Sequence, residues 1–188
     1  CRSCFGVFQF LPGIRSSSTT ENDTVSIQRT VEDFKYIVGK QAAFMCKLRS
    51  TDADDGEVTF GMAITDTSPI ATLPGDGLYF HKAETATVMS FSAKKNGATV
   101  AGSTITTVDQ IAMADDADRC YGFIIDRSGQ VNVYWGLNYN AMQLVGIIPA
   151  GNANLPDDEE LALTFAVMTG AADAITLLVD GVAYMSER

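Results

Sequence analysis

One histidine is the side chain whose type most readily suggests catalysis. His81 is the single histidine, so any mechanism that pairs histidine with a serine or cysteine nucleophile would have to use it. It follows Phe80 on an expected strand, and the alternation of a strand turns it toward solvent or a groove. The G-x-S-x-G motif of one serine hydrolase class does not occur in the sequence. We therefore expect no catalytic role for His81.

Acidic residues form three runs. Two carboxylates that face each other across a cleft can hydrolyse a glycosidic bond, but here no expected strand carries such a pair. A loop rich in acids is usually a solvated surface, so the sequence predicts a protein that is not an enzyme. The runs are Asp52, Asp54, Asp55 and Glu57; Asp115, Asp116 and Asp118; and Asp157, Asp158, Glu159 and Glu160.

Two patterns in the sequence could indicate a metal site. Asp52, Asp54, Asp55 and Glu57 superficially resemble a calcium loop, but no glutamate follows at the twelfth position, and strands rather than helices flank the run. Calcium on this loop stays an open alternative. Cys1 and Cys4 have the spacing of half a zinc site and lack a second pair, because the remaining cysteines, Cys46 and Cys120, are isolated. The sequence thus predicts free thiols, no metal and no cofactor.

Aromatic side chains offer a different chemistry, the stacking of a ring on a sugar. Four candidates occur near expected strand ends, and the alternative for each is packing in the core or on a sheet face. Burial is the default for Trp135, which ends an alternating strand. The four are Tyr79, Tyr134, Trp135 and Tyr139.

Charge and length exclude several classes of protein. The 188 residues carry 23 acids and 13 bases, a net charge of −10, and this excess of acid argues against a nucleic-acid surface, which needs a field of lysine and arginine. No window approaches the roughly 18 apolar residues of a membrane-spanning helix, so no membrane contact is expected. One domain is the expectation for this length.

The elements that would position these side chains are strands. Large and small residues alternate over 58–64, and similar runs follow at 78–80, 88–93, 121–125, 131–135, 161–168 and 175–179. Asn96-Gly97 is a strong signal for a tight hairpin turn, and Asp126 to Gly129 marks a second one. The pattern predicts an all-β protein, an antiparallel β-sandwich or jelly roll over residues 25–188.

Residues 1–24 differ from the rest. An aromatic segment precedes a polar, aperiodic stretch at 16–23, which reads as an extended N-terminal arm followed by a linker. Such an arm would dock on a partner; the alternative is that it adds an edge strand to its own domain. The residues expected to make the contact are Phe5, Val7, Phe8, Phe10 and Leu11.

Three segments carry a resemblance to a known family. They are Phe60–Ile70 followed by Gly75–Lys82, then Tyr121–Tyr134, and finally Leu177–Val182 with the ending to Arg188. Together they resemble tailed-bacteriophage structural proteins with a concanavalin-like or laminin-G-like jelly roll, over roughly residues 30–188. The resemblance implies a capsid decoration (cement) protein on the outer surface of a phage head, made in the bacterial cytoplasm.

The partners implied by that resemblance are the major capsid protein and further copies of the chain, as a dimer or trimer. A face with net negative charge suits the outside of a shell, away from packaged DNA. Two other functions stay open: a carbohydrate-binding, lectin-like module or fibre domain that would use the four aromatics, and a tail or head–tail joining protein. Glycan binding lost in a Tyr79→Ala or Tyr134→Ala variant would favour the lectin-like module.

Overall fold

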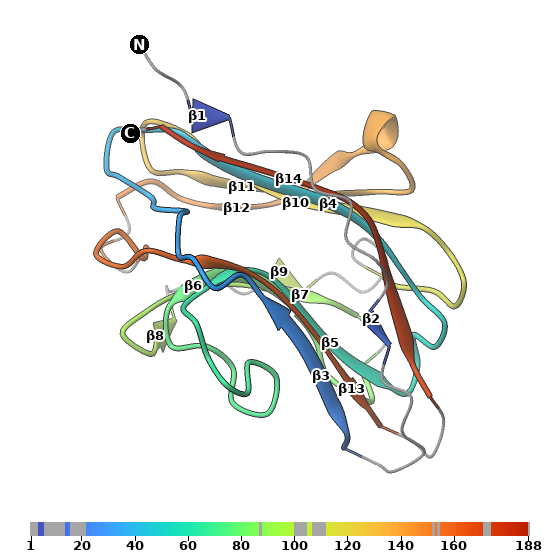
Figure 1. The fold of residues 1–188 in the computed structure, drawn as a ribbon. Helices are drawn as coiled ribbons and strands as arrows, with labels where there is room; N and C mark the ends of the chain where they lie inside the picture. The colour runs from blue at the N-terminus through green and yellow to red at the C-terminus, as the bar shows by residue number, and fades with distance from the viewer. Residues whose placement is uncertain are drawn as a thin grey trace.

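The chain folds into two antiparallel sheets packed face to face, as predicted (Figure 1). The computed structural model describes residues 22–86, 88–98, 112–151, 153, 155–170 and 174–187, and the backbone of 4–5, 14–15, 99 and 105–106. We call one sheet the back sheet, in the order β1-β14-β4-β10-β11-β12 with β2 also on β14, and the other the front sheet, in the order β3-β13-β5-β6-β7-β8 with β9 also on β7.

The strand bounds agree closely with the alternating runs of the sequence. A single short 3-10 helix, η1, interrupts the strands of the described part of the chain, and none of its helices is long and apolar enough to cross a membrane. The elements are β1 Cys4–Phe5, β2 Ile14–Arg15, β3 Thr24–Gln28, β4 Ala42–Ser50, β5 Gly56–Ala63, β6 Gly77–Lys82, β7 Ser90–Lys95, β8 Ala98–Thr99, β9 Ile105–Thr106, β10 Arg119–Ile125, β11 Val131–Gly136, η1 Tyr139–Ala141, β12 Gln143–Ile148, β13 Ala162–Thr169 and β14 Thr176–Ser186.

Both predicted hairpins form. Asn96 and Gly97 adopt φ of 52° and 75° between β7 and β8, the positive values that a tight two-residue turn requires. The turn between β10 and β11 uses Gly129 at φ 84°, and the Asp126 carboxylate accepts hydrogen bonds from the backbone N–H of Ser128 and Gln130. Local turn chemistry thus fixes two strand registers that the alternating pattern leaves free.

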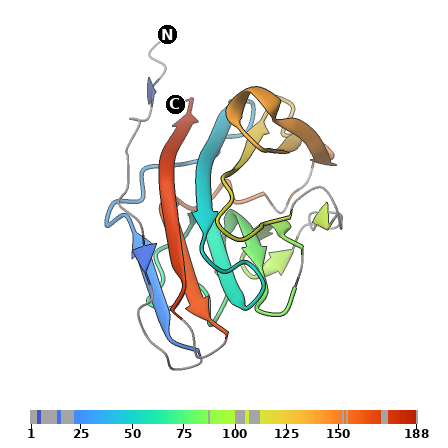
Figure 2. The same cartoon turned by 90° about the vertical axis from the view of Figure 1, so that its right-hand side faces the viewer.

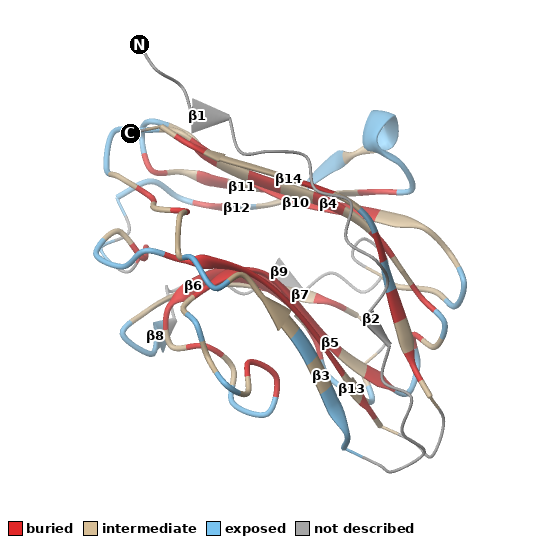
Figure 3. Ribbon diagram, in the orientation of Figure 1, coloured by how far each residue is buried: buried red, intermediate tan, exposed pale blue. Residues whose placement is uncertain are grey.

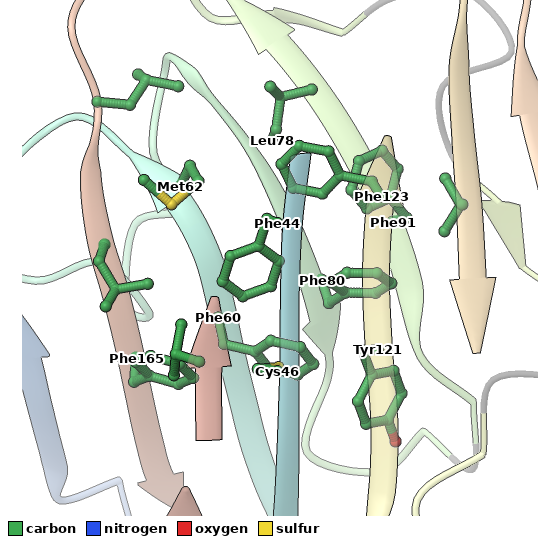
Figure 4. Packing of buried hydrophobic residues seen from close by; sticks show 14 of the residues in the cluster. Phe44, Cys46, Phe60, Met62, Leu78, Phe80, Phe91, Tyr121, Phe123 and Phe165 are labelled. Carbon is green, nitrogen blue, oxygen red and sulfur yellow. The ribbon is translucent and has the colours of Figure 1, made fainter. Parts of the chain in front are cut away.

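Aromatic rings fill the space between the sheets (Figure 4), and many residues of the facing strands are buried (Figure 3). Phe60 and Phe80 stack at 5.1 Å on the front sheet, and Tyr121 of the back sheet meets both, at 5.1 and 5.5 Å. Cys46 is buried in the same core with a free thiol, and burial raises its pKa well above the ordinary value. This core holds the two sheets as one rigid scaffold whose outer faces remain for ligands.

The N-terminal segment lies beside the back sheet where it is described. Cys4–Phe5 pairs with Met185–Ser186 and Ile14–Arg15 pairs with Thr176–Leu177, both along the edge of β14 (Figures 1 and 2). This is the edge-strand alternative for the arm, at these four positions. The side chain of Phe5, and all of Val7, Phe8, Phe10 and Leu11, lie outside the described residues, so their contacts with a partner stay a prediction.

Candidate binding site

The two outer faces of the sandwich differ in shape. Both sheets bend in the same direction in Figure 1, so the outer face of the front sheet is concave and that of the back sheet is convex. Burial follows this curvature: outward-facing Thr59 and Thr164 of the front sheet are 0% and 1% exposed, whereas Ile124 and Leu144 of the back sheet are 42% and 49% exposed. The concave front face can enclose a ligand to a degree that the back face cannot.

A row of small and polar side chains crosses the front face. The strand registers align Ser26, Ala166, Thr59, His81 and Ser90 on five neighbouring strands. Residues opposite each other share one face of an antiparallel sheet, so the whole row points out of the concave side. Sequence separation hides this row, because its members lie up to 140 residues apart.

His81 lies at the polar centre of this row. Its Nδ1 is 3.1 Å from Thr59 Oγ1, and its Nε2 is 3.8 Å from Glu57 Oε1. The side chains of His81 and Glu57 are only 16% and 15% exposed. The second distance is too long for a hydrogen bond, so one imidazole nitrogen and one carboxylate oxygen face each other without a bond between them.

Both members of this pair have shifted pKa values, in directions that disfavour an ion pair. Burial, with the nearby charges of Lys94 and Lys82, lowers the pKa of His81 to about 4. Burial and the charge of Glu84 raise the pKa of Glu57, and Lys82 partly offsets this. The imidazole is therefore neutral at pH 7. When the Thr59 hydroxyl donates to Nδ1, the ring proton lies on Nε2 and is directed toward Glu57.

The loop after β5 covers the other end of the front face. Gln28 Nε2 donates to Thr164 Oγ1 at 2.9 Å, while its Oε1 accepts from the backbone N–H of Asp66 at 2.9 Å. Further along, the Tyr79 hydroxyl donates to Pro74 O at 3.4 Å and the ring is 0% exposed. The prediction that Tyr79 stacks on a sugar is therefore wrong, because the loop encloses the ring.

Lys82 occupies the centre of the acidic loop at residues 52–57, which was the candidate calcium site. Its ammonium is held by four backbone oxygens, those of Gly56 at 2.7 Å, Ala83 at 3.2 Å, Glu84 at 3.2 Å and Asp54 at 3.3 Å. Burial lowers the pKa of this 1% exposed lysine, while the neighbouring carboxylates oppose the shift. The lysine thus supplies the positive charge around which the loop folds.

The carboxylates of this loop are directed elsewhere. Asp52 Oδ1 accepts from the backbone N–H of Asp54 at 3.1 Å and of Asp55 at 3.0 Å, which closes a turn. Glu57 faces His81. Within the described part of the chain no three histidine, cysteine or acidic side chains group as metal ligands, so Asp52, Asp54, Asp55 and Glu57 do not assemble into the calcium site considered above.

The convex back face carries a groove of about 300 Å³. Gly122 lies in it: a Cβ there would come within 2.8 Å of Phe44 O and 3.4 Å of the Met142 methyl group. The lining is almost wholly apolar, and exposed Leu144 and Ile147 of β12 extend it across the neighbouring strand. The residues that line the groove are Ala43, Phe44, Met45, Gly122, Phe123, Ile124, Tyr134 and Met142.

The three other candidate aromatics are divided between this face and the core. Tyr134 lines the groove, and Tyr139, 42% exposed, reaches from η1 to donate to Gly181 O of β14 at 3.3 Å. Trp135 alternates with Tyr134, so its ring turns inward and packs against the core. The structure therefore brings Tyr134 and Tyr139 onto one face and separates them from Tyr79 and Trp135.

Next to Tyr139 the back face carries two basic and two acidic residues, whose charges cancel. Lys47 Nζ contacts Asp180 at 2.6 Å and Asp118 at 2.9 Å, and Arg49 Nε contacts Asp118 at 2.9 Å. These hydrogen bonds raise the pKa of Lys47 and lower that of Asp118. The back face thus combines an apolar groove with a charged cluster whose formal charges sum to zero, on a molecule with net charge −10.

Comparison with known proteins places the fold. No family model and no curated protein matches the chain. The carbohydrate recognition domain of Emp47p is similar, with a TM-score of 0.60 and 10% identity over 96% of this chain and 89% of that one. The exoplasmic/lumenal domain of VIP36, solved with Ca²⁺ and Man3GlcNAc, has a TM-score of 0.60 and 11% identity over 97% and 83%.

An enzyme shares the architecture. The endo-1,3-beta-glucanase from Streptomyces sioyaensis has a TM-score of 0.58 and 13% identity, over 86% of this chain and 69% of that one. Identities this low establish the fold alone. The protein has a lectin-like, concanavalin-like β-sandwich, which confirms the predicted architecture. None of the three structures named is a phage protein, so the virion function has no support from them.

Proposed function

We propose that the protein is a carbohydrate-binding module whose ligand lies on the concave front face. The observation that carries this proposal is the Glu57–His81–Thr59 arrangement. An imidazole nitrogen and a carboxylate oxygen lie 3.8 Å apart without bonding each other. A sugar hydroxyl both donates and accepts, so a single hydroxyl can accept from Nε2–H and donate to Glu57.

The surroundings suit a saccharide for a second reason. Ser26 and Ser90 extend the polar row to either side of His81. Ala166 and Thr59, which lie between Ser26 and His81, have small side chains that leave space above the sheet. A sugar would therefore meet the hydroxyls of Ser26 and Ser90 along this line, and the Ser90 hydroxyl, which donates to His81 O, is left as an acceptor. The two carbohydrate-recognition domains described above share the fold, and this likeness supports the proposal without locating the ligand.

Binding without hydrolysis is the form that we propose. A glycosidase needs two carboxylates flanking the bond, and along the polar row of the described front face Glu57 is the carboxylate in contact range of His81. Glu84 lies close enough to raise the pKa of Glu57, so the test must include an assay for glycan cleavage. Release of new reducing ends that stops in a Glu57→Gln variant would make the protein an enzyme.

The test is a glycan array followed by calorimetry on each hit. Glu57→Gln keeps the shape of the side chain and removes the charge-assisted bond, so affinity should fall about tenfold or more. Tyr134→Phe on the back face is the matched control and should bind normally. An array on which the wild-type protein binds no glycan would contradict the proposal.

A second candidate function is attachment to a protein shell as a decoration protein. The observation that favours it is the back face, where Ile124, Leu144 and Ile147 are exposed next to an apolar groove. The major capsid protein would be the partner, with further copies of the chain around it on the outer surface of a virion. Counting the copies of the chain in purified particles tests this: hundreds of copies would support it, and absence from particles would exclude it.

A further inference from the structure

Three buried hydrogen-bond donors lack an acceptor at one end of the sandwich interior. They are Arg119 Nε, the Tyr121 hydroxyl and Trp135 Nε1. Each is shielded from solvent and has no well-aligned hydrogen-bond partner among the described residues, although the Trp135 side chain lies close enough to the Tyr121 oxygen to lower the pKa of that hydroxyl. Buried polar atoms are nearly always paired in proteins, because an unpaired one costs about 1–3 kcal/mol. Three such atoms in one place therefore indicate a site whose occupant comes from outside the chain.

The sheet brings these donors together. Arg119 and Tyr121 are two residues apart on β10, so both side chains point into the sandwich, and Trp135 is the direct partner of Tyr121 on β11. Tyr121 is 0% exposed and packs against the stacked rings of Phe60 and Phe80, whereas Arg119 and Trp135 are partly exposed. The cluster thus has a fixed base and a rim that reaches solvent.

Arg119 is also a cation with no carboxylate partner among the described residues. Its Nη1 donates to the backbone oxygen of Asp118 at 2.9 Å, which leaves the edge that carries Nε unused. Other cations of this acidic protein do have carboxylate partners, such as Lys47 with Asp118 and Arg127 with Glu187. The charge of Arg119 is felt at Tyr121, where it opposes the burial that raises the pKa of the hydroxyl.

We propose that Arg119, Tyr121 and Trp135 form a binding site for a carboxylate group. The Nε edge of a guanidinium matches the two oxygens of a carboxylate, and the indole N–H and phenol O–H supply further donors. A water molecule fits less well: it has two lone pairs and no charge, so one water accepts from at most two of the three donors, whereas a carboxylate has about four lone-pair sites and a charge that matches the guanidinium. The site is independent of the front face and of the proposed glycan function.

The single tryptophan makes this site directly observable. Trp135 is the only tryptophan in the chain, so its fluorescence and its one indole N–H resonance report on this cluster alone. We would titrate the wild-type protein with sodium acetate at constant ionic strength, with sodium chloride as the matched salt. Acetate should give a saturable change in both signals, and chloride should not. A response that never saturates, or one that chloride reproduces, would overturn the proposal.

Two variants and two further ligands complete the test. Arg119→Gln should weaken acetate binding at least tenfold, and Tyr121→Phe should weaken it several-fold; Arg127→Gln at the surface should leave it unchanged. Unaltered acetate affinity in a folded Arg119→Gln protein would refute the site. If that variant does not fold, the wild-type resonance and Tyr121→Phe still decide. Glucuronate then identifies the source of the carboxylate, with glucose, which has no carboxylate, as the control that should not bind. A higher affinity for glucuronate than for acetate indicates an acidic sugar, and equal affinities for the two indicate a free small acid.

Discussion

The two outer faces of the sandwich obey the same alternation of side chains and yet present opposite chemistry. The front face carries a concave polar row in which Thr59 and His81 are shielded and Ser26, at the edge, is exposed. The back face carries Ile124 and Leu144 in the open. The difference teaches that strand alternation determines which residues leave the core, while sheet curvature determines whether those residues can surround a ligand. Polar groups on the concave side and apolar groups on the convex side are suited to different partners.

The largest effect is expected at the loop that borders the front face. Lys82→Met removes the donor from four backbone carbonyl groups, one buried and three part-buried, which should lower the free energy of unfolding by about 3 kcal/mol. Urea denaturation measures it. Lys95→Met, which removes a lysine paired with Asp157 outside this loop, is the matched control and should shift the midpoint much less. Equal losses in the two variants would show that the carbonyl cage does not hold this loop.

Substituting one glycine in each sheet compares how tightly the two backbones are packed. A Cβ at Gly61 on the front sheet would lie 2.5 Å from Leu78 O, and its φ of 145° is one that side chains rarely adopt. Gly122 on the back sheet has a similar close contact, 2.8 Å, without a positive φ. Gly61→Ala should therefore destabilise by about 3 kcal/mol and Gly122→Ala by about 1–2 kcal/mol. Thermal unfolding of both variants checks the order, and the reverse order would contradict it.

The pH dependence of stability should report on His81. Its pKa is near 6.5 when unfolded and about 4 when folded, so the unfolded chain binds the extra proton between these values. The contribution is complete above pH 6.5 and is lost as the pH falls toward 4, by about 2 kcal/mol after allowing for partial exposure. The raised pKa of Glu57 acts in the opposite direction.

The control for this effect is the His81→Gln variant. The difference in unfolding free energy between wild type and variant, measured by urea denaturation at several pH values, isolates the histidine because the acidic residues are common to both. A difference that stays constant from pH 7 to pH 4 would mean that His81 titrates as an exposed histidine.

The smallest effect is expected on the back face. Leu144→Lys places a charge on a side chain that is already 49% exposed, so stability should change by less than about 0.5 kcal/mol. Glycan affinity should not change, because this residue belongs to the opposite face. A loss of glycan binding in Leu144→Lys, seen by calorimetry, would move the site to the back face.

The sequence predicts what is local and misses what depends on distant contacts. The Asn96-Gly97 and Asp126–Gly129 turns are readable because the turn residues themselves require the conformation. Tyr79 could not be placed, because its cover is a loop that Gln28 holds from another strand. The Lys82 cage escapes prediction for the same reason, since its ligands are backbone oxygens with no sequence signature.

Part of the candidate site was nevertheless visible. His81 was expected to face solvent or a groove, and it does lie on the outward face of the front sheet. Its partners Thr59 and Glu57 are brought to it by the β5–β6 register, which alternation alone does not fix. The donors of Arg119, Tyr121 and Trp135 gave no signal in the sequence, because an unpaired donor is recognisable only once every possible acceptor is located.

The central claim is that a glycan occupies the front face. The most direct test is an amide chemical-shift map of the labelled protein, titrated with the glycan that scores highest on an array. The account predicts that chemical-shift changes concentrate along the row from Ser26 to Ser90 and are largest at Thr59 and His81. The amide resonances of Ile124 and Leu144 should not shift. Shifts confined to the back face, or no glycan that binds at all, would contradict it.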